Sequence, residues 1–229
     1  MEFKNFTYLI LLVASVSVPL ALSFDKKVQY YKNLKYILPA ILVAAAVFLV
    51  WDINFTEAKI WGFHPEYNIG LHYFGLPIEE WLFFLVIPYA CVFIYEVLKV
   101  YLAKYEFANY FIIFSLLLMV GFALISYFFR QQIYTFFTFL LSAIYLGYTV
   151  FRNQFKQHIT KFYFAYFVSL IPFIIVNGIL TSLPVVEYNS LHIMNIRLIS
   201  IPVEDFSYFF LMLLMVTTIY EFLKERRYY

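Results

Sequence analysis

Cysteine and charged residues are scarce in this sequence, and both shortages limit what the protein can be. The only cysteine, Cys91, lies within an apolar segment, which excludes an internal disulfide and a cysteine-rich metal site. Charged residues make up 13% of the chain and the formal net charge is +2, too small to suggest a nucleic-acid partner. No Gly-x-Gly-x-x-Gly turn follows a predicted strand, and no His-x-x-x-His spacing supports a metal site. We therefore expect no cofactor and no bound metal.

What the sequence has in excess is apolar side chains. Hydrophobic residues make up 64% of the chain and the mean hydropathy is +0.81, which the surface of a water-soluble protein cannot accommodate. A bilayer core about 30 Å thick takes roughly 20 helical residues to cross. Apolar segments of this order predict an all-α polytopic membrane protein with seven transmembrane helices, of which the second is the shortest. They cover residues 6–23, 36–51, 76–98, 108–129, 133–151, 162–180 and 201–223.

The first apolar segment has a second interpretation, as a cleaved signal peptide that ends at Ala21-Leu22-Ser23. Its first turn carries Glu2 beside Lys4, however, and lacks the basic start typical of such peptides. We therefore treat this segment as a membrane span.

The distribution of basic residues predicts the orientation of the chain, because loops rich in Lys and Arg stay cytoplasmic. One set of connections holds most of these residues, and it predicts an outer N-terminus and a cytoplasmic C-terminus. This set contains Lys26, Lys27, Lys32, Lys35, Lys99, Lys104, Arg152, Lys156, Lys161, Lys224, Arg226 and Arg227, whereas the other set contains Lys4, Lys59, Arg130 and Arg197.

A short acidic signature occurs twice, each time at the start of an apolar segment. Pro77-Ile78-Glu79-Glu80 precedes the third segment, and Pro202-Val203-Glu204-Asp205 precedes the seventh, 125 positions later. The same offset relates Tyr95-Glu96 and Lys99 to Tyr220-Glu221 and Lys224. The chain therefore divides into a first three-helix repeat (1–106), a linking helix (107–130) and a second three-helix repeat (131–229). Because the linking helix is a single crossing, the two repeats are predicted to be parallel in the membrane.

The four acids of these signatures are candidate catalytic residues. A carboxylate in the first turn of a helix is also explained by capping and by the helix dipole, so each signature alone is ambiguous. Recurrence favours function, because each copy follows a long outer connection, 52–75 or 181–200, and acids near hydrocarbon are costly. A protonated carboxyl can donate a proton and a neighbouring carboxylate can accept one. Glu96 and Glu221, by contrast, are interpreted as structural, each in an ion pair with the lysine three residues later in its own helix.

Longer motifs in both halves resemble one enzyme family. The first half, with Trp51-Asp52, Trp61-Gly62-Phe63, Gly70 and Pro77 to Phe84, resembles the c-type half of the small membrane lycopene cyclases. The second half resembles the d-type half through Val176-Asn177-Gly178, Pro184 to Asn189, Arg197 and Ile201 to Asp205. The resemblance covers nearly the whole chain and is closest to the fused form, in which both halves share one polypeptide. The chain departs from the family pattern at His64, where Asn is expected, and at Asn195, where Gly is expected.

The resemblance implies a lycopene cyclase that converts lycopene through gamma-carotene to beta-carotene without net oxidation or reduction. It implies that Glu79, Glu80, Glu204 and Asp205 supply the acid and base. Side chains implied to bind substrate or support these acids, with packing or membrane anchoring as the alternative, are Trp81, Phe84, Asn177, Arg197, Phe206 and Tyr208. Lycopene and gamma-carotene would reach the protein from the lipid of a bacterial cell membrane, and pathway enzymes or a second copy of the chain are further candidate partners.

Two other classes of protein fit a seven-helix chain. A retinal-binding receptor or photoprotein needs a lysine deep within a helix, but Lys224 lies at the cytoplasmic end of the last predicted helix. A proton-coupled transporter would use intramembrane acids and repeats. Parallel repeats with acids at one face fit alternating access poorly. Both remain alternatives to the cyclase at this stage.

Overall fold

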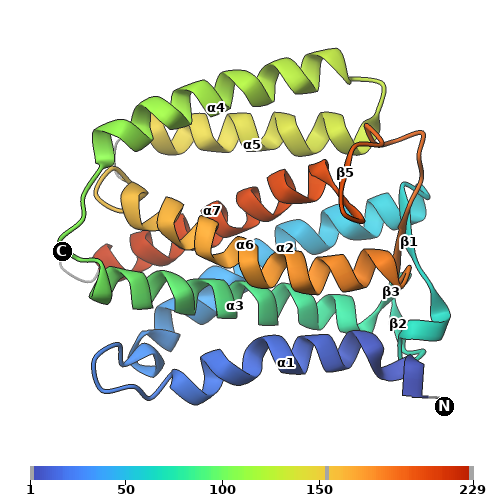
Figure 1. Cartoon of the computed structure of the whole chain (residues 1–229), viewed down its shortest axis with the longest axis horizontal. Coiled ribbons are helices and arrows are strands. Elements are labelled where there is room, and N and C mark those ends of the chain that lie inside the picture. The colour runs from blue at the N-terminus through green and yellow to red at the C-terminus, as the bar shows by residue number, and fades with distance from the viewer. Residues whose placement is uncertain (1–2, 153–154, 227–229) are drawn as a thin grey trace.

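The computed structural model describes residues 3–152 and 155–226. Within these residues, seven helices are long and apolar enough to cross a membrane (Figure 1). The predicted all-α fold is confirmed, and the chain is an integral membrane protein. The helices are α1 (Thr7–Leu22), α2 (Leu34–Glu57), α3 (Ile78–Tyr101), α4 (Ala108–Phe128), α5 (Ile133–Phe151), α6 (Ile159–Ser182) and α7 (Val203–Glu225), with short 3-10 turns at Phe3–Phe6, Tyr30–Asn33 and Pro65–Tyr67.

The prediction that the second span is the shortest was wrong. α2 has 24 residues and continues to Glu57, so Asp52 belongs to the helix and not to the connection after it. Two polar residues lie inside the helix where the apolar pattern stops. Asp52 points into the protein and is 3% exposed, and the Asn54 side-chain amide donates to the Val50 carbonyl at 2.5 Å.

The helices lie side by side with α1 at one edge and α4 at the opposite edge (Figure 1). α2, α3, α6 and α7 form the centre, where α2 packs on α7 and α3 packs on α6. α1 packs against α3, and α5 packs against α7 in the same way. α4 packs on α5, so the linking segment adds a helix beside the second half that has no counterpart beside the first half.

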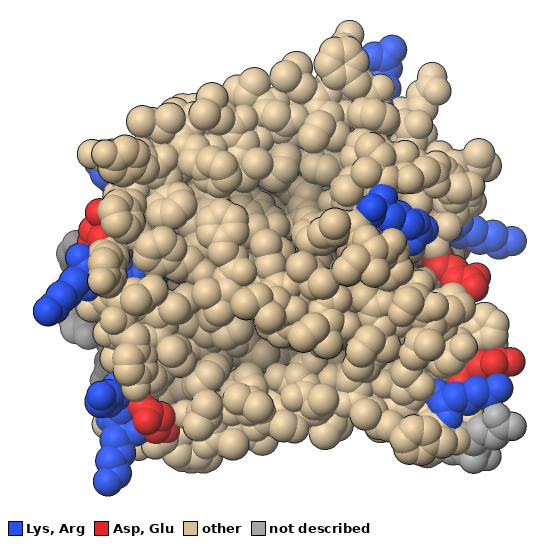
Figure 2. Space-filling view, viewed as in Figure 1, with Lys and Arg blue, Asp and Glu red and all other residues tan. Residues whose placement is uncertain are grey.

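Charged side chains gather at the two ends of the helix bundle, and the surface between them is uncharged on the face seen in Figure 2. We call the end where α3 and α7 begin the acid end, and the end where they finish the lysine end. Arg227, which contributed to the predicted orientation, lies outside the described residues, as does Glu2.

Short strands occupy the acid end and follow the 125-residue offset. β1 (Trp61–Phe63) pairs antiparallel with β4 (Val186–Tyr188), and Gly62 faces its own counterpart Glu187 at the centre of the pairing. β2 (His72–Tyr73) pairs with β3 (Leu76–Pro77), and β5 (Arg197–Leu198) pairs with β6 (Ile201–Pro202) in the same register. The two outer connections therefore adopt the same fold and join each other at their symmetric point.

The two outer connections also have the same backbone conformation at Asn195, where this chain departs from the family pattern, and at its counterpart Gly70. Gly70 has φ +83° and its counterpart Asn195 has φ +60°, a left-handed conformation that glycine adopts freely and asparagine tolerates better than most residues. Asn195 therefore replaces glycine without a change of backbone conformation. The next pair, Phe74 and Ile199, also has positive φ, at +50° and +61°.

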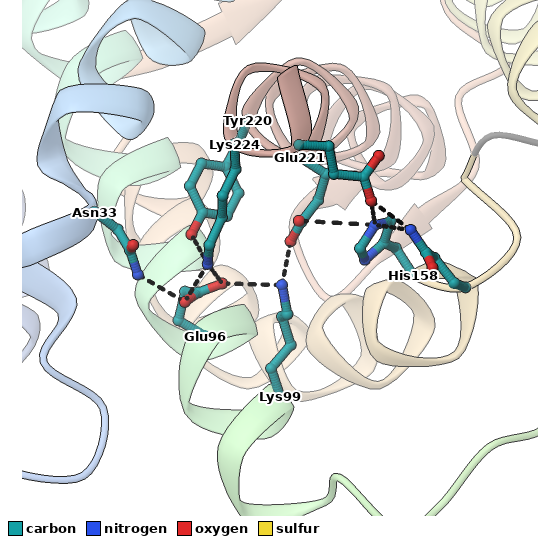
Figure 3. Close-up of polar contacts among 9 residues, drawn as sticks. Asn33, Glu96, Lys99, His158, Tyr220, Glu221 and Lys224 are labelled. Carbon is teal, nitrogen blue, oxygen red and sulfur yellow. Dashed lines mark hydrogen bonds and ion pairs between the residues drawn. The ribbon is translucent and has the colours of Figure 1, made fainter. Parts of the chain in front are cut away.

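At the lysine end the two halves are joined by ion pairs that cross between α3 and α7 (Figure 3). Lys99 lies 2.5 Å from Glu221, and its counterpart Lys224 lies 3.2 Å from Glu96. The prediction of ion pairs within each helix was incomplete, because only Lys99 also contacts the glutamate of its own helix, at 3.4 Å. The pairs cross because α3 and α7 run side by side, which brings each lysine close to the other helix.

Candidate active site

A small cavity of about 70 Å³, lined mostly by buried side chains, lies at the acid end, where the two halves meet. Helices from both halves and the strands β1 and β4 contribute to its wall. Acidic, aromatic and amide side chains share the wall with apolar ones. The lining residues are Tyr8, Asp52, Trp61, Phe63, Glu80, Phe83, Tyr134, Phe173, Asn177, Leu180, Val186, Tyr188, Asp205, Tyr208, Phe209 and Met212.

Asp205, in the first turn of α7, is the most heavily hydrogen-bonded acid of the cavity. The Tyr134 hydroxyl donates to its Oδ1 at 2.7 Å. The Asn177 amide and the Tyr188 hydroxyl both donate to its Oδ2 at 2.8 Å. These donors come from α5, α6 and β4, so three elements fix the position of one carboxyl group that is 4% exposed.

Tyr188 is held in the form that donates. Burial among aromatic rings and the neighbouring Asp205 carboxylate raise the pKa of Tyr188 well above its usual value. The hydroxyl is therefore protonated throughout the physiological range. The tyrosine packs parallel to Tyr134, with ring centroids 5.8 Å apart, so the two donors to Asp205 support each other.

Glu80, in the first turn of α3, has one side-chain hydrogen-bond partner among the described residues. The Tyr8 hydroxyl of α1 donates to its Oε2 in a short hydrogen bond. Tyr8 is 1% exposed and Glu80 is 7% exposed. α1 is therefore part of the cavity wall, which agrees with its interpretation as a membrane span.

Asp52 of α2 is a cavity acid that the sequence-based prediction missed. It is 3% exposed, and its Oδ2 has no hydrogen-bond partner among the described residues. The 125-residue offset makes Asp52 the counterpart of Asn177, which was predicted as a site residue. The repeat therefore contained a signal for Asp52. Tyr8, Tyr134 and Tyr188 were also not predicted as site residues, because aromatic residues are too common in this chain to stand out.

Glu79 and Glu204 are fully buried but do not line the cavity. Glu79 Oε1 accepts the backbone N–H of Ile69 at 2.8 Å, and Glu204 Oε1 accepts the backbone N–H of Met194 at 2.7 Å. The Thr135 hydroxyl also donates to Glu204 Oε1, at 2.6 Å. Each of these two glutamates thus holds the outer connection that precedes it, in equivalent positions of the two halves.

The predicted supporting residues lie at different distances from the cavity. Tyr208 and Asn177 line it. Phe84 is buried behind it against Phe48, with ring centroids 6.1 Å apart, and Phe206 packs on Phe173 at 5.1 Å. Trp81 donates from its indole N–H to the Tyr73 carbonyl at 3.3 Å.

Arg197 is exposed on β5 and reaches no carboxylate within ion-pair distance among the described residues. Its guanidinium donates to the Ser200 carbonyl at 2.6 Å and lies 5.8 Å from the centre of the Tyr188 ring. Arg197 therefore contacts its own loop and Tyr188. It forms no ion pair with Asp205, to which Tyr188 in turn donates a hydrogen bond.

One group in the described residues has the composition of a metal site, and it lies at the lysine end. His158, Glu221 and Glu225 offer ligand atoms within 4.8 Å of one another. Each is already engaged, since Glu221 pairs with Lys99 at 2.5 Å and His158 with Glu225 at 2.8 Å. We account for this group by its hydrogen bonds and the ion pair with Lys99.

The comparisons with known proteins agree with the geometry of the two halves. The family model described as lycopene cyclase matches residues 5–98 and 131–223. The unmatched segment between these ranges contains α4, the helix outside the repeat. No curated protein and no solved structure shows a significant match. Two matched halves that meet at one acidic cavity lead to the conclusion that the chain belongs to the lycopene cyclase family.

Proposed function

We propose that this protein is a lycopene beta-cyclase that closes the ends of lycopene through gamma-carotene to beta-carotene. A proton adds to the terminal double bond of the polyene, and a neighbouring double bond attacks the resulting cation to close a six-membered ring. A different proton then leaves the ring. One proton is gained and one is lost, so the reaction is an isomerisation that needs no oxidant or reductant.

The observation that carries this proposal is the set of three buried carboxyl groups, Asp52, Glu80 and Asp205, around one cavity. Proton transfer by positioned side chains accelerates reactions by roughly 10²–10⁴-fold. Asp205 accepts three hydrogen bonds and is arranged as the group that removes a proton. Asp52 has an oxygen with no donor among the described residues, so it can present an O–H to the substrate. Glu80 accepts one side-chain hydrogen bond, from Tyr8, fewer than the three that Asp205 accepts.

The carbocation needs shelter from water and from nucleophiles while the ring closes. Trp61 and Tyr208 line the cavity, with ring centroids 6.3 Å apart. An aromatic face stabilises a desolvated cation by about 0.5 to 2 kcal/mol. We assign these two rings to the cation, and we assign Glu79 and Glu204 to holding the outer connections that close the cavity.

The repeat organisation extends the proposal to the whole chain. We infer a fused c-type and d-type cyclase, with repeats at 1–106 and 131–229 joined by residues 107–130. The family match, which skips the linking helix, supports this division. We further propose that the acid end faces outward from a bacterial cell membrane and that the lysine end is cytoplasmic, because the basic residues concentrate there.

Expression in a lycopene-producing host tests the function directly. Cells with the wild-type protein are expected to accumulate beta-carotene at the expense of lycopene, and chromatography with absorption spectra identifies each pigment. Asp205→Asn and Glu80→Gln, which keep the size of the side chain and remove the acid, are expected to leave lycopene unconverted. Lycopene that stays unconverted by wild-type protein present in the membrane would falsify the proposed function.

A further inference from the structure

A second, larger cavity adjoins the acidic one and opens toward the lipid. It has a volume of about 410 Å³ and is formed by one face each of α1, α3 and α6. Its outer rim contains Val18 of α1, which is 61% exposed, and Ile175 of α6, which is 57% exposed. Because these helices cross the membrane, side chains exposed at mid-helix face hydrocarbon and not water.

The wall of this cavity carries no charged residue. Its polar side chains are few: Ser15 is bonded to a carbonyl of its own helix, Asn177 is bonded to Asp205, and the buried Ser169 hydroxyl has no hydrogen-bond partner among the described residues. Along α3 the wall extends from Phe83 to Ile94, which is about 16 Å at the helical rise. A long apolar slot of this kind matches an unsubstituted hydrocarbon chain.

The two cavities share part of their walls. Phe83, Phe173, Asn177 and Phe209 line both. Asn177 therefore stands at the junction, with its amide on Asp205 and its remaining surface facing the slot. A linear molecule that lies in the slot has its end directed at the carboxyl groups.

Three side chains of the slot have larger counterparts at the repeat-related positions. The 125-residue offset places Phe139 opposite Ala14, Met215 opposite Ala90 and Trp51 opposite Val176. Phe139 is 5% exposed, and Trp51 stacks on Phe48 with ring centroids 5.8 Å apart. α4 also covers α5, the counterpart of α1. The two halves thus share a sequence repeat but differ in the side chains around the slot.

We propose that the α1–α3–α6 slot is the channel through which the polyene substrate enters from the lipid, and that it admits one end of the molecule at a time to a single reaction site. This inference rests on the proposed function. The hydrocarbon chain lies along α3, its terminal double bonds lie beside Asn177 and Asp205, and the remainder extends into the bilayer. Closing the second end then requires the one-ring product to leave the slot and to enter again in reverse.

Filling the slot tests the proposal, and another cavity of the molecule provides the control. Ala14→Trp and Ala90→Trp place a large ring in the slot without touching the acids. Leu118→Trp fills a cavity of about 320 Å³ between α4, α6 and α7 that shares no lining residue with the acidic one. Cyclisation of lycopene in membranes is expected to fall at least about tenfold in the two slot variants, because a chain displaced from the site loses its alignment. Leu118→Trp is expected to keep the wild-type rate.

Substrate binding gives a second measurement that does not depend on turnover. Asp205→Asn protein, purified from lycopene-producing cells, is expected to retain lycopene, and Asp205→Asn combined with Ala90→Trp is expected to lose it. The amount of protein and its unfolding temperature in detergent are measured for each variant. Should Ala14→Trp or Ala90→Trp be poorly folded, Ala90→Leu replaces them in both measurements.

The outcomes separate the channel from the function. An active wild-type enzyme with folded slot variants that cyclise and bind lycopene normally would overturn the channel and leave the cyclase intact. An inactive wild-type enzyme would overturn the cyclase. In a time course with purified enzyme and labelled lycopene, gamma-carotene is expected to build up before beta-carotene. Added unlabelled gamma-carotene is expected to lower the label found in beta-carotene, because the one-ring intermediate leaves the enzyme. Label in beta-carotene that is unaffected by this addition would overturn the entry of one end at a time.

Discussion

Asp52 and Asn177 occupy equivalent positions in the two halves, but the first is an acid and the second an amide. The Asn177 amide donates a hydrogen bond to the Asp205 carboxylate at 2.8 Å. Asp52 Oδ2 has no hydrogen-bond partner among the described residues. The repeat therefore places an acid on one side of the cavity and an amide on the other. Two similar halves thus create one asymmetric site: three donors hold Asp205 of the second half, whereas Oδ2 of Asp52 in the first half has no hydrogen-bond partner among the described residues.

This asymmetry makes Asp52→Asn a sharp test of the acid. The change keeps the shape of the side chain and removes its ability to donate a carboxyl proton. We expect a loss of cyclisation of about 100-fold with unchanged protein stability, measured as the rate of lycopene consumption in membranes. Glu57→Gln, an exposed acid of the same helix, is the control and should be neutral. Equal activity of Asp52→Asn and wild type would remove Asp52 from the mechanism.

Neighbouring acids are expected to differ in their roles. Glu80→Gln and Asp205→Asn should lower the rate by about 100-fold or more, since both side chains line the cavity. Glu79→Gln and Glu204→Gln should retain most of the activity, because the amide oxygen can still accept the backbone N–H of Ile69 or Met194. The cyclisation rates of the four purified variants, compared at equal protein concentration, show which acids take part in the reaction. The assignment fails if the glutamine variants at 79 and 204 are as inactive as those at the cavity.

The tyrosines around Asp205 should matter through hydrogen bonding. A hydrogen bond to a charged group contributes about 1.5–3 kcal/mol, so Tyr134→Phe and Tyr188→Phe should each slow the reaction by roughly 10- to 100-fold. Because the pKa of Tyr188 is raised well above its usual value, its hydroxyl should keep donating as the pH rises to about 9. The activity of Tyr188→Phe relative to wild type should therefore not rise toward one as the pH approaches about 9. Such a rise would show that the wild type loses its Tyr188 donor in this range.

Much of the fold was predictable because helices that cross a membrane must be long and apolar. Segment 133–151 matches α5 at both ends, since polar residues flank it on each side. The end of α2 was missed because a polar residue inside a protein looks the same in sequence as one in a loop. Only the packing around Asp52 shows that it is buried.

The division between cavity acids and loop-holding acids was not predictable from the signatures. Glu79 and Glu80 are adjacent, so their side chains leave the helix about 100° apart, and the rotation of α3 decides which one meets the cavity. That rotation is set by packing against α1, α2, α6 and α7, which no local pattern contains. The pairing of β1 with β4 likewise joins segments 125 residues apart through backbone hydrogen bonds, which have no residue signature.

The crossed ion pairs at the lysine end give the last prediction. Glu221 is 3% exposed and lies 2.5 Å from Lys99, while the His158 imidazole is 3.7 Å away. Lys99→Met leaves this carboxylate buried without its ammonium partner. We expect the free energy of unfolding to fall by about 1–3 kcal/mol, and by an amount near the lower limit because Lys99 is partly solvated. The measurement is the unfolding temperature in detergent, which should decrease.

Removing the stranded charge as well should restore part of that loss. Lys99→Met combined with Glu221→Gln is therefore expected to unfold at a higher temperature than Lys99→Met alone, which is the signature of a coupled pair. Lys104→Met removes an exposed lysine near the same end and should leave the unfolding temperature unchanged. If Lys104→Met is as destabilising as Lys99→Met, or if the double variant is no more stable than the single one, the ion pair does not join α3 to α7 energetically. All three variants should keep the ratio of beta-carotene to gamma-carotene, because Lys99 and Glu221 lie at the opposite end of α3 and α7 from the cavity acids.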